Sequence, residues 1–120
     1  MAADPGPGRG TAGRTPGLPV VTESHLLEAV AAFAAVRGWL VHHDRPARTK
    51  DGWRTAMQGH QGFPDLVLVR GGRLIFVELK AEKGRVSSTQ ERWIAELRTT
   101  GSLVCVWRPS DWPEIERTLM

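Results

Sequence analysis

Two carboxylates and one ammonium group lie on two neighbouring apolar runs of this sequence. Asp65 opens the run "DLVLV", and Glu78 and Lys80 lie near the end of the run "LIFVELK". Burying an unpaired charge costs free energy, so a core strand that carries such residues needs a reason to keep them. We therefore treat Asp65, Glu78 and Lys80 as candidate functional residues.

The letters between the two runs predict how these residues face one another. "RGGR" is typical of a β-hairpin with a primed turn. An antiparallel register about this turn places Asp65 opposite Glu78, and directly opposed residues share one face of a sheet. Lys80, two residues beyond Glu78, returns to that face, whereas Leu79 points to the other side. Two carboxylates and one ammonium group are thus expected at one end of the sheet.

This grouping has a known chemical use. Two carboxylates so close repel each other, which raises one pKa unless a cation joins them. Mg²⁺ is often held by one or two carboxylates together with water and substrate phosphate, and it polarises a phosphoryl oxygen. The ammonium of Lys80 would orient the nucleophile or stabilise the charge that builds on phosphorus. The alternative is a solvated cluster of charges at a strand end, without catalytic function.

The rest of the chain supplies the elements that must position these residues. Periodicity, capping residues and turn residues predict the order α-β-β-β-α-β-α, an α/β fold whose helices pack on a mixed four-stranded sheet. We expect helices over residues 22–37, from a cap at Ser87 or Ser88 to before Gly101, and at the C-terminal end, with strands over residues 39–43, 63–69, 74–80 and 103–107.

Two segments lack such periodicity. Residues 1–20 are rich in Gly and Pro, so we expect a disordered tail before one domain over residues 21–120. Residues 44–62, "DRPARTKDGWRTAMQGHQG", read as a long irregular loop that is either solvated or in contact with phosphates and bases. Basic residues of this loop and of the turn after the second run are candidate phosphate contacts: Arg48, Lys50, Arg54, Lys83 and Arg85.

Composition limits the class of protein. The net charge is +3 and the pI about 9.8, which permits a polyanionic partner. The single cysteine, Cys105, excludes an internal disulfide and reads as a buried strand residue. No apolar run approaches the roughly 20 residues of a membrane span, and no signal peptide is visible. We therefore expect no membrane association and a cytoplasmic protein.

The string "GFPDLVLV…VELKAEKGRVSSTQERWIAEL" resembles the VRR-NUC family, the virus-type replication–repair nucleases of the PD-(D/E)XK superfamily. The likeness is carried by a Gly-x-Pro-Asp start, a Glu-x-Lys strand, a Gly, a Ser/Thr cap and a Gln that opens a helix. "TE…GW" and "WRPSDW" are also similar to small stand-alone members from phages and prophages. The resemblance covers about residues 22–120.

The resemblance implies a restriction-endonuclease-like αβββαβ core. It also implies a metal-dependent nuclease that hydrolyses phosphodiester bonds of DNA. A structure-selective activity on junctions or flaps, in phage or prophage replication, recombination or repair within a bacterial cell, is the expected role. A domain of this size would bind a two-fold substrate as a homodimer.

Site residues follow from the resemblance by position. Asp65 and Glu78 would bind Mg²⁺ or Mn²⁺, with the backbone carbonyl of Leu79 as a further ligand. Lys80 would be the catalytic lysine. Gln90 would orient groups at the site, although a capping-box role also explains a Gln at this place.

The family's first helix also supplies a Glu. Glu23 matches best, because its distance to "GW" fits the similar phage proteins, and Glu28 is the alternative. Compensation of the helix dipole is another explanation for Glu23. His43 and His60 are expected near the site, but a lone histidine more often has no chemical role.

Two other classes of function compete with the nuclease. One is a non-catalytic DNA-binding module on the same fold. The other is an interaction protein in which the charges of the hairpin are incidental. The presence of Asp65, Glu78 and Lys80 together favours the nuclease, because a binding module has no need of all three.

Overall fold

The computed structural model describes residues 20–44, 47–49, 52–54 and 58–120, with backbone alone for 47–49 and 52–54. The expected tail, apart from Val20, and the candidate Lys50 lie outside the described residues. The elements are α1 (Glu23–Val36), β1 (Leu40–His42), β2 (Ala47–Thr49), β3 (Gly52–Arg54), β4 (Leu66–Arg70), β5 (Arg73–Leu79), α2 (Ser88–Thr99), β6 (Leu103–Trp107), a 3₁₀ turn η1 (Pro109–Asp111) and α3 (Trp112–Leu119).

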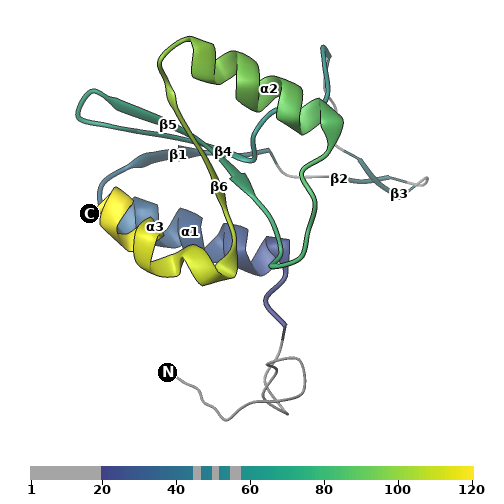
Figure 1. Ribbon diagram of the computed structural model, residues 1–120. Helices are drawn as coiled ribbons and strands as arrows, with labels where there is room; N and C mark the ends of the chain where they lie inside the picture. The colour runs from purple at the N-terminus through teal and green to yellow at the C-terminus, as the bar shows by residue number, and fades with distance from the viewer. Residues whose placement is uncertain (1–19, 45–46, 50–51, 55–57) are drawn as a thin grey trace.

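A mixed sheet of four strands organises the molecule, as the sequence predicts. Its order is β1-β4-β5-β6, with β1, β4 and β5 antiparallel and β5 parallel to β6. Helices α1 and α3 cover one face of the sheet and α2 covers the other (Figure 1). No helix in the described part of the chain is long and apolar enough to cross a membrane.

The prediction of an irregular loop over residues 44–62 is wrong in its middle. β2 and β3 form a separate antiparallel pair in which Arg48 lies opposite Trp53 (Figure 1). The prediction searched for the alternating apolar residues of a strand that packs on a core. The pair β2 and β3 lies outside the main sheet and does not have this pattern.

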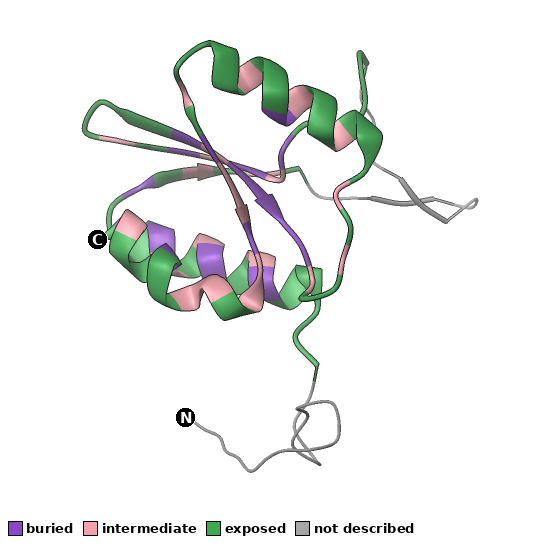
Figure 2. Cartoon of the chain, viewed as in Figure 1, coloured by how far each residue is buried: buried purple, intermediate pink, exposed green. Residues whose placement is uncertain are grey.

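The hydrophobic core lies between the main sheet and the pair α1 and α3. Alternate residues of β4 and β5 point toward these helices, and Figure 2 shows the buried positions along both. The core consists of Leu26, Val30, Ala34, Trp39, Leu66, Leu68, Ile75, Val77, Leu79, Trp107, Ile115 and Leu119. Ile94 and Val104 are buried on the α2 side. Cys105 is only half buried, contrary to the prediction.

The hairpin between β4 and β5 has the predicted register. Arg70 lies opposite Arg73, and the pairing continues to Leu66 opposite Val77. Gly71 and Gly72 have φ angles of 54° and 81°, so both central residues adopt the left-handed conformation of a primed turn. The next pair in this register is the one between Asp65 and Glu78.

The first strand of the hairpin begins later than expected. β4 starts at Leu66, so Phe63, Pro64 and Asp65 precede it rather than belong to it. Pro64 has no N–H to donate to a ladder, which explains why the pairing stops short of it. Asp65 therefore stands directly before one strand, and Lys80 directly after the other.

Side-chain caps begin the two longer helices. Thr22 Oγ1 accepts a 3.1 Å hydrogen bond from His25 N at the start of α1, as predicted. Ser87, rather than Ser88, caps α2: its Oγ accepts from Gln90 N at 3.2 Å, and Gln90 Oε1 accepts from Ser87 N at 2.9 Å. This reciprocal pair is a capping box and fixes the backbone at the first turn of α2.

Arg70, at the β4–β5 turn, joins the ends of two helices. Its guanidinium donates to the carbonyl oxygens of Arg37 at 2.8 Å and Met120 at 2.7 Å, and also contacts that of Leu119. It also stacks on the Trp39 ring at 4.5 Å from the ring centre. The turn thereby holds the C-terminal end of α3 against the end of α1.

Candidate active site

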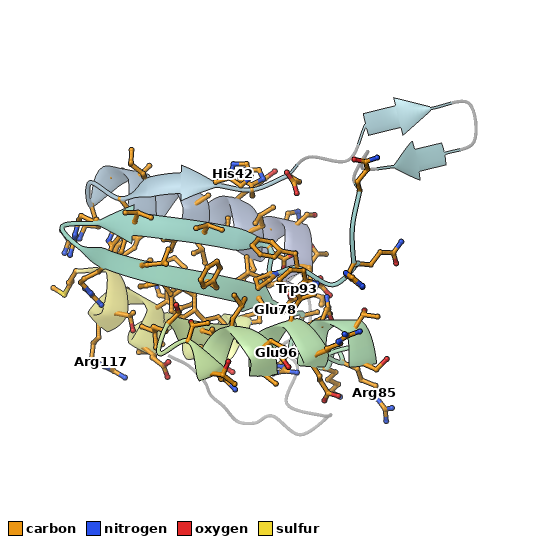
Figure 3. All side chains as sticks on the ribbon, turned by 90° about the horizontal axis from the view of Figure 1, so that it is seen from above. His42, Glu78, Arg85, Trp93, Glu96 and Arg117 are labelled. Carbon is orange, nitrogen blue, oxygen red and sulfur yellow. The ribbon has the colours of Figure 1, made fainter. Side chains whose placement is uncertain are left out.

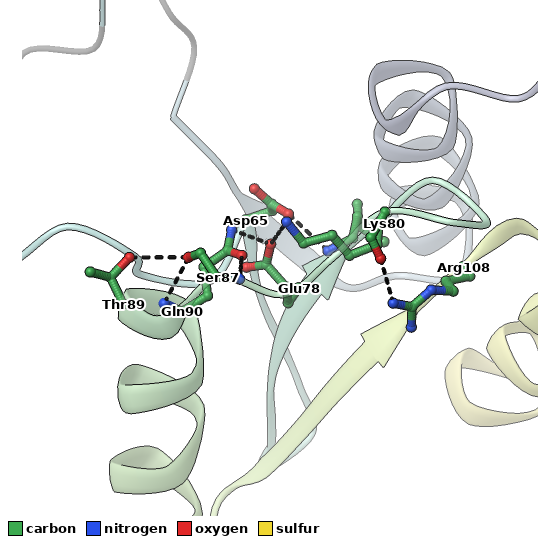
Figure 4. Close-up of polar contacts among 9 residues, drawn as sticks. Asp65, Glu78, Lys80, Ser87, Thr89, Gln90 and Arg108 are labelled. Atoms are coloured by element: carbon green, nitrogen blue, oxygen red, sulfur yellow. Dashed lines mark hydrogen bonds and ion pairs between the residues drawn. The ribbon is translucent and has the colours of Figure 1, made fainter.

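Glu78 is buried, with 1% of its surface exposed, although it carries a carboxyl group. Its Oε2 accepts a 2.7 Å hydrogen bond from Gln90 Nε2 and lies 3.6 Å from Lys80 Nζ (Figure 4). Lys80 is also buried, with 7% exposed. The alternative of a solvated charge cluster at a strand end is therefore wrong for these two residues.

Asp65 is fixed to the backbone of the opposite strand. Its Oδ2 accepts a 2.8 Å hydrogen bond from Leu79 N, the residue between Glu78 and Lys80. The pKa of Glu78 is raised to about 8, first because burial penalises the charged form and then because Asp65 is negative. Lys80 opposes this shift. Burial therefore contributes more to the raised pKa of Glu78 than the facing carboxylate does.

One oxygen of Glu78 has no hydrogen-bond partner among the described residues. It is Oε1, which is fully buried, whereas Oε2 is bound by Gln90 and faces Lys80. A buried carboxylate oxygen without a donor is costly, so such an atom needs an explanation. A cation in contact with Oε1 would supply the missing partner.

A cavity of about 380 Å³ opens beside Asp65 and Leu79. Glu23 lines it together with Asp65 and Leu79, and Glu23 also contributes to the raised pKa of Glu78. Its other lining residues are Ser24, Leu27, Asp44, Phe63 and Pro64. The structure thus brings Glu23, and not the exposed Glu28, to the carboxylates.

The described residues do not give the cavity a complete ligand set of side chains. Within the residues that the structure describes, no three His, Cys, Asp or Glu side chains form a group that could hold a metal ion. A pair of carboxylates with an unpartnered oxygen still fits Mg²⁺, which is often bound by one or two carboxylates, water and substrate phosphate. The donor set therefore fits a hydrated ion shared with substrate.

Two glycines allow close approaches around the site. Gly62 has a φ of 101°, and a Cβ there would lie 2.6 Å from the Thr89 carbonyl group. The segment that leads to Asp65 is therefore seated directly on the first turn of α2. A Cβ at Gly84 would lie 3.5 Å from Glu23 Oε2, so the turn after Lys80 passes close to the start of α1.

Arg108 was not identified from the sequence as a site residue. Its Nη2 donates to Gly84 O at 2.7 Å (Figure 4), and Ser110 N and Oγ donate to the two carboxylate oxygens of Glu82. These bonds attach the turn after Lys80 to the segment that follows β6. The contacts join residues distant in the sequence, so only the resemblance of "WRPSDW" pointed to this region.

The candidate phosphate contacts lie in two different regions of the structure. Lys83 and Arg85 are exposed on the turn between Lys80 and α2. Arg48 lies on β2 and Arg54 on β3, but their side chains are outside the description. His43 contacts the backbone of its neighbour, Asp44, and His60 lines a second cavity.

A family model for the VRR-NUC domain matches residues 19–111. The chain belongs to the VRR-NUC domain family. A solved structure of a "VRR_NUC domain protein" is similar, with a TM-score of 0.54 and 20% identity, and covers 75% of this chain and 79% of its own. That likeness supports the fold alone. No curated protein matches the chain.

Membership in the VRR-NUC family implies a nuclease-type function in DNA processing. The predicted family and the predicted fold are thus both confirmed. In this VRR-NUC domain, the candidate residues Asp65, Glu78, Lys80 and Gln90 meet at one end of the sheet, with Glu23 at the adjoining cavity.

Proposed function

We propose that this VRR-NUC domain is a Mg²⁺- or Mn²⁺-dependent nuclease that hydrolyses phosphodiester bonds in branched DNA. The observation that carries the proposal is the buried group formed by Glu78, Lys80 and Gln90 beside Asp65. A binding module would gain nothing from burying a carboxylate and an ammonium group, because burial of charge is costly. Catalysis repays that cost, because these charges then act on substrate from fixed positions.

Asp65 and Glu78 would hold the divalent ion. The unpartnered Oε1 of Glu78 is one donor, the carboxylate of Asp65 is another, and the backbone carbonyl of Leu79 would be a third. A bound ion of this kind polarises a phosphoryl oxygen and lowers the pKa of bound water. Glu23, on the wall of the same cavity, would accept hydrogen bonds from the water around the ion.

Lys80 and Gln90 would prepare the site without binding the ion. Gln90 donates a hydrogen bond to Oε2 of Glu78, which leaves Oε1 free to bind the ion. The ammonium of Lys80 lies on the Oε2 side and would orient the attacking water or stabilise the negative charge of the transition state. Both side chains contact the carboxyl group of Glu78, which holds them in place beside it.

The surroundings of the site support DNA as substrate. Lys83 and Arg85 are exposed on the turn after Lys80, and the chain carries a net charge of +3. The β2–β3 hairpin projects beyond the end of the sheet at which Glu78 lies (Figures 1 and 3). Such a projection would contact a second arm of a junction or flap.

The test is cleavage of end-labelled junction, flap and plain duplex DNA, with Mg²⁺ and with EDTA. The proposal expects cleavage that requires the ion and is fastest on a branched substrate. Binding without cleavage under every ion condition would instead support the non-catalytic module. Sedimentation of the complex with a four-way junction would show whether two copies act together, as a two-fold substrate favours.

A further inference from the structure

A second cavity, of about 240 Å³, lies beside the segment that leads to Asp65. It is lined by the segment before Gly62 and by the first three turns of α2. The lining residues are His60, Gln61, Thr89, Arg92, Trp93 and Glu96. None of them belongs to the carboxylate group described above.

Trp93 is the fixed wall of this cavity. Its Nε1 donates a 3.2 Å hydrogen bond to the carbonyl oxygen of His60. Its ring meets that of Phe63 edge to face at a centre distance of 5.0 Å, and Phe63 meets Phe76 in the same way at 5.9 Å. These contacts hold the indole in one orientation before any ligand arrives.

Phe63 separates the second cavity from the cavity beside Asp65. It lines the cavity beside Asp65 and contacts Trp93, which lines the second. The two are also joined through α2, because Gln90 bonds to Glu78 and stands three residues before Trp93. Figure 3 shows Trp93 and Glu78 at the same end of the sheet. A DNA strand whose phosphate reached the carboxylates would pass close to the first turns of α2 and bring a neighbouring nucleotide toward Trp93.

We propose that this second cavity receives one unpaired nucleobase of the DNA substrate, stacked on Trp93, beside the phosphate that is cleaved. The inference rests on the proposed nuclease function and names the feature of DNA that the site selects. Base–aromatic stacking tolerates every base, because each has a π-face. The domain would thus prefer positions at which a base has left its pair, as at a flap or junction.

The chemistry of the rim favours a base over a phosphate group. Arg92 offers hydrogen-bond donors and Glu96 an acceptor, and the edge of a base carries groups of both kinds. A phosphate carries only acceptors and would be repelled by Glu96. The volume of about 240 Å³ is below the roughly 300–1,000 Å³ of pockets for drug-sized ligands, which suits one ring system.

The experiment compares two DNA duplexes that differ only in the presence of one nucleobase. Each carries a single unpaired nucleotide, which has an intact base in one duplex and is abasic in the other. Affinities are measured in Ca²⁺ for the whole chain. We expect wild type to bind the duplex with the base about 5- to 150-fold more tightly, the range that base–aromatic stacking supplies.

Two substitutions at Trp93 test the cause of that preference. Trp93→Leu should bind both duplexes with the affinity of wild type for the abasic duplex. Trp93→Phe keeps an aromatic face and should retain most of the preference. If Trp93→Leu does not fold, Arg92→Ala with Glu96→Ala, both at exposed positions, should still reduce the ratio severalfold. Equal affinity of wild type for both duplexes would overturn the inference.

Cleavage of the same duplexes in Mg²⁺ separates this inference from the nuclease proposal. Cleavage with no preference for the intact base would overturn the proposed base site and leave the nuclease proposal standing. A preference in binding, with no cleavage of any DNA, would overturn the nuclease proposal and leave the base site standing. In the expected result, the abasic duplex is both bound more weakly and cleaved more slowly at limiting enzyme.

Discussion

The side chains of Gln90 and Glu78 are joined by a 2.7 Å hydrogen bond between α2 and β5. The same Gln90 side chain accepts from Ser87 N, so one residue both caps the helix and binds the buried carboxylate. The capping role of Gln90 and its bond to the carboxyl group of Glu78 therefore coexist, as the sequence analysis allows. The consequence for Glu78 is an asymmetric carboxylate, with Oε2 occupied and Oε1 without a partner.

The raised pKa of Glu78 predicts how stability depends on pH without metal. Folding raises this pKa from 4.5 to about 8, so the folded state holds the proton more tightly. The stabilisation is complete below the unfolded pKa and is lost as pH rises through about 8. Glu78→Gln cannot ionise. Its melting temperature in EDTA, relative to that of wild type, should therefore be higher at about pH 9 than at about pH 5. An equal difference at both pH values would contradict the prediction.

Replacing Lys80 should slow catalysis while the fold remains. Losing one electrostatic donor to the transition state costs roughly 10²–10³ in rate. We expect Lys80→Ala, and the better-filling Lys80→Met, to bind DNA in Ca²⁺ but to cleave at least about a hundredfold more slowly in Mg²⁺. Lys83→Ala, at an exposed position three residues on, is the control and should retain most activity. Cleavage by Lys80→Met at the wild-type rate would refute the role of the ammonium.

Metal binding should depend on Asp65 and not on Glu28. Asp65→Asn keeps an oxygen that can accept from Leu79 N but removes the charge, so Mn²⁺ binding measured by calorimetry should fall below detection. Glu23→Gln should weaken binding less, because Glu23 is proposed to act through water. Glu28→Gln changes an exposed carboxylate of the same helix and should leave the isotherm unchanged. Unaltered binding by Asp65→Asn would place the ion elsewhere.

The exposed turn after Lys80 should contribute to DNA affinity without sequence preference. Replacing both Lys83 and Arg85 by Ala should weaken binding to all sequences similarly and reduce the salt slope by about 2. The matched control is the double replacement of Arg37 and Arg117, which removes the same charge. Figure 3 shows Arg117 and Arg85 at opposite ends of the molecule. Equal slopes for the two double variants would mean that this turn is only solvated.

Two glycines provide a paired test of how α2 is seated. Gly62 and Gly59 have similar φ angles, 101° and 105°, so alanine is strained at both. Only Gly62→Ala also meets the backbone at Thr89 and Gln90, within 2.6–2.8 Å. Its free energy of unfolding should therefore fall by about 1–3 kcal/mol more than that of Gly59→Ala. Equal losses in denaturant titrations would show that the approach relaxes without cost.

Local rules explain what could be predicted from the sequence. The register that pairs Arg70 with Arg73 depends on a turn of two glycines, so counting outward from it reached Asp65 and Glu78. The capping box at Ser87 is likewise encoded within four residues. Such features need no knowledge of how distant segments pack.

The remainder depends on contacts between distant segments. The bond from Arg108 to Gly84 and the packing of Trp93 on Phe63 join residues that no periodicity relates. The depth of burial of Glu78 was also unpredictable, because it depends on α2 closing over that face. β2 and β3 were missed for another reason, since their pairing does not involve the apolar pattern of the main sheet.

The burial of α3 determines when the domain can fold during synthesis. Ile115 and Leu119 are fully buried in the same cluster as Leu26 and Val30 of α1, and Arg70 also binds the end of α3. A nascent chain that has not yet reached α3 therefore exposes the apolar side of its first helix and of its sheet. The ribosome must release nearly all of the described residues before this side closes. Chaperones that bind apolar segments have their opportunity in that interval.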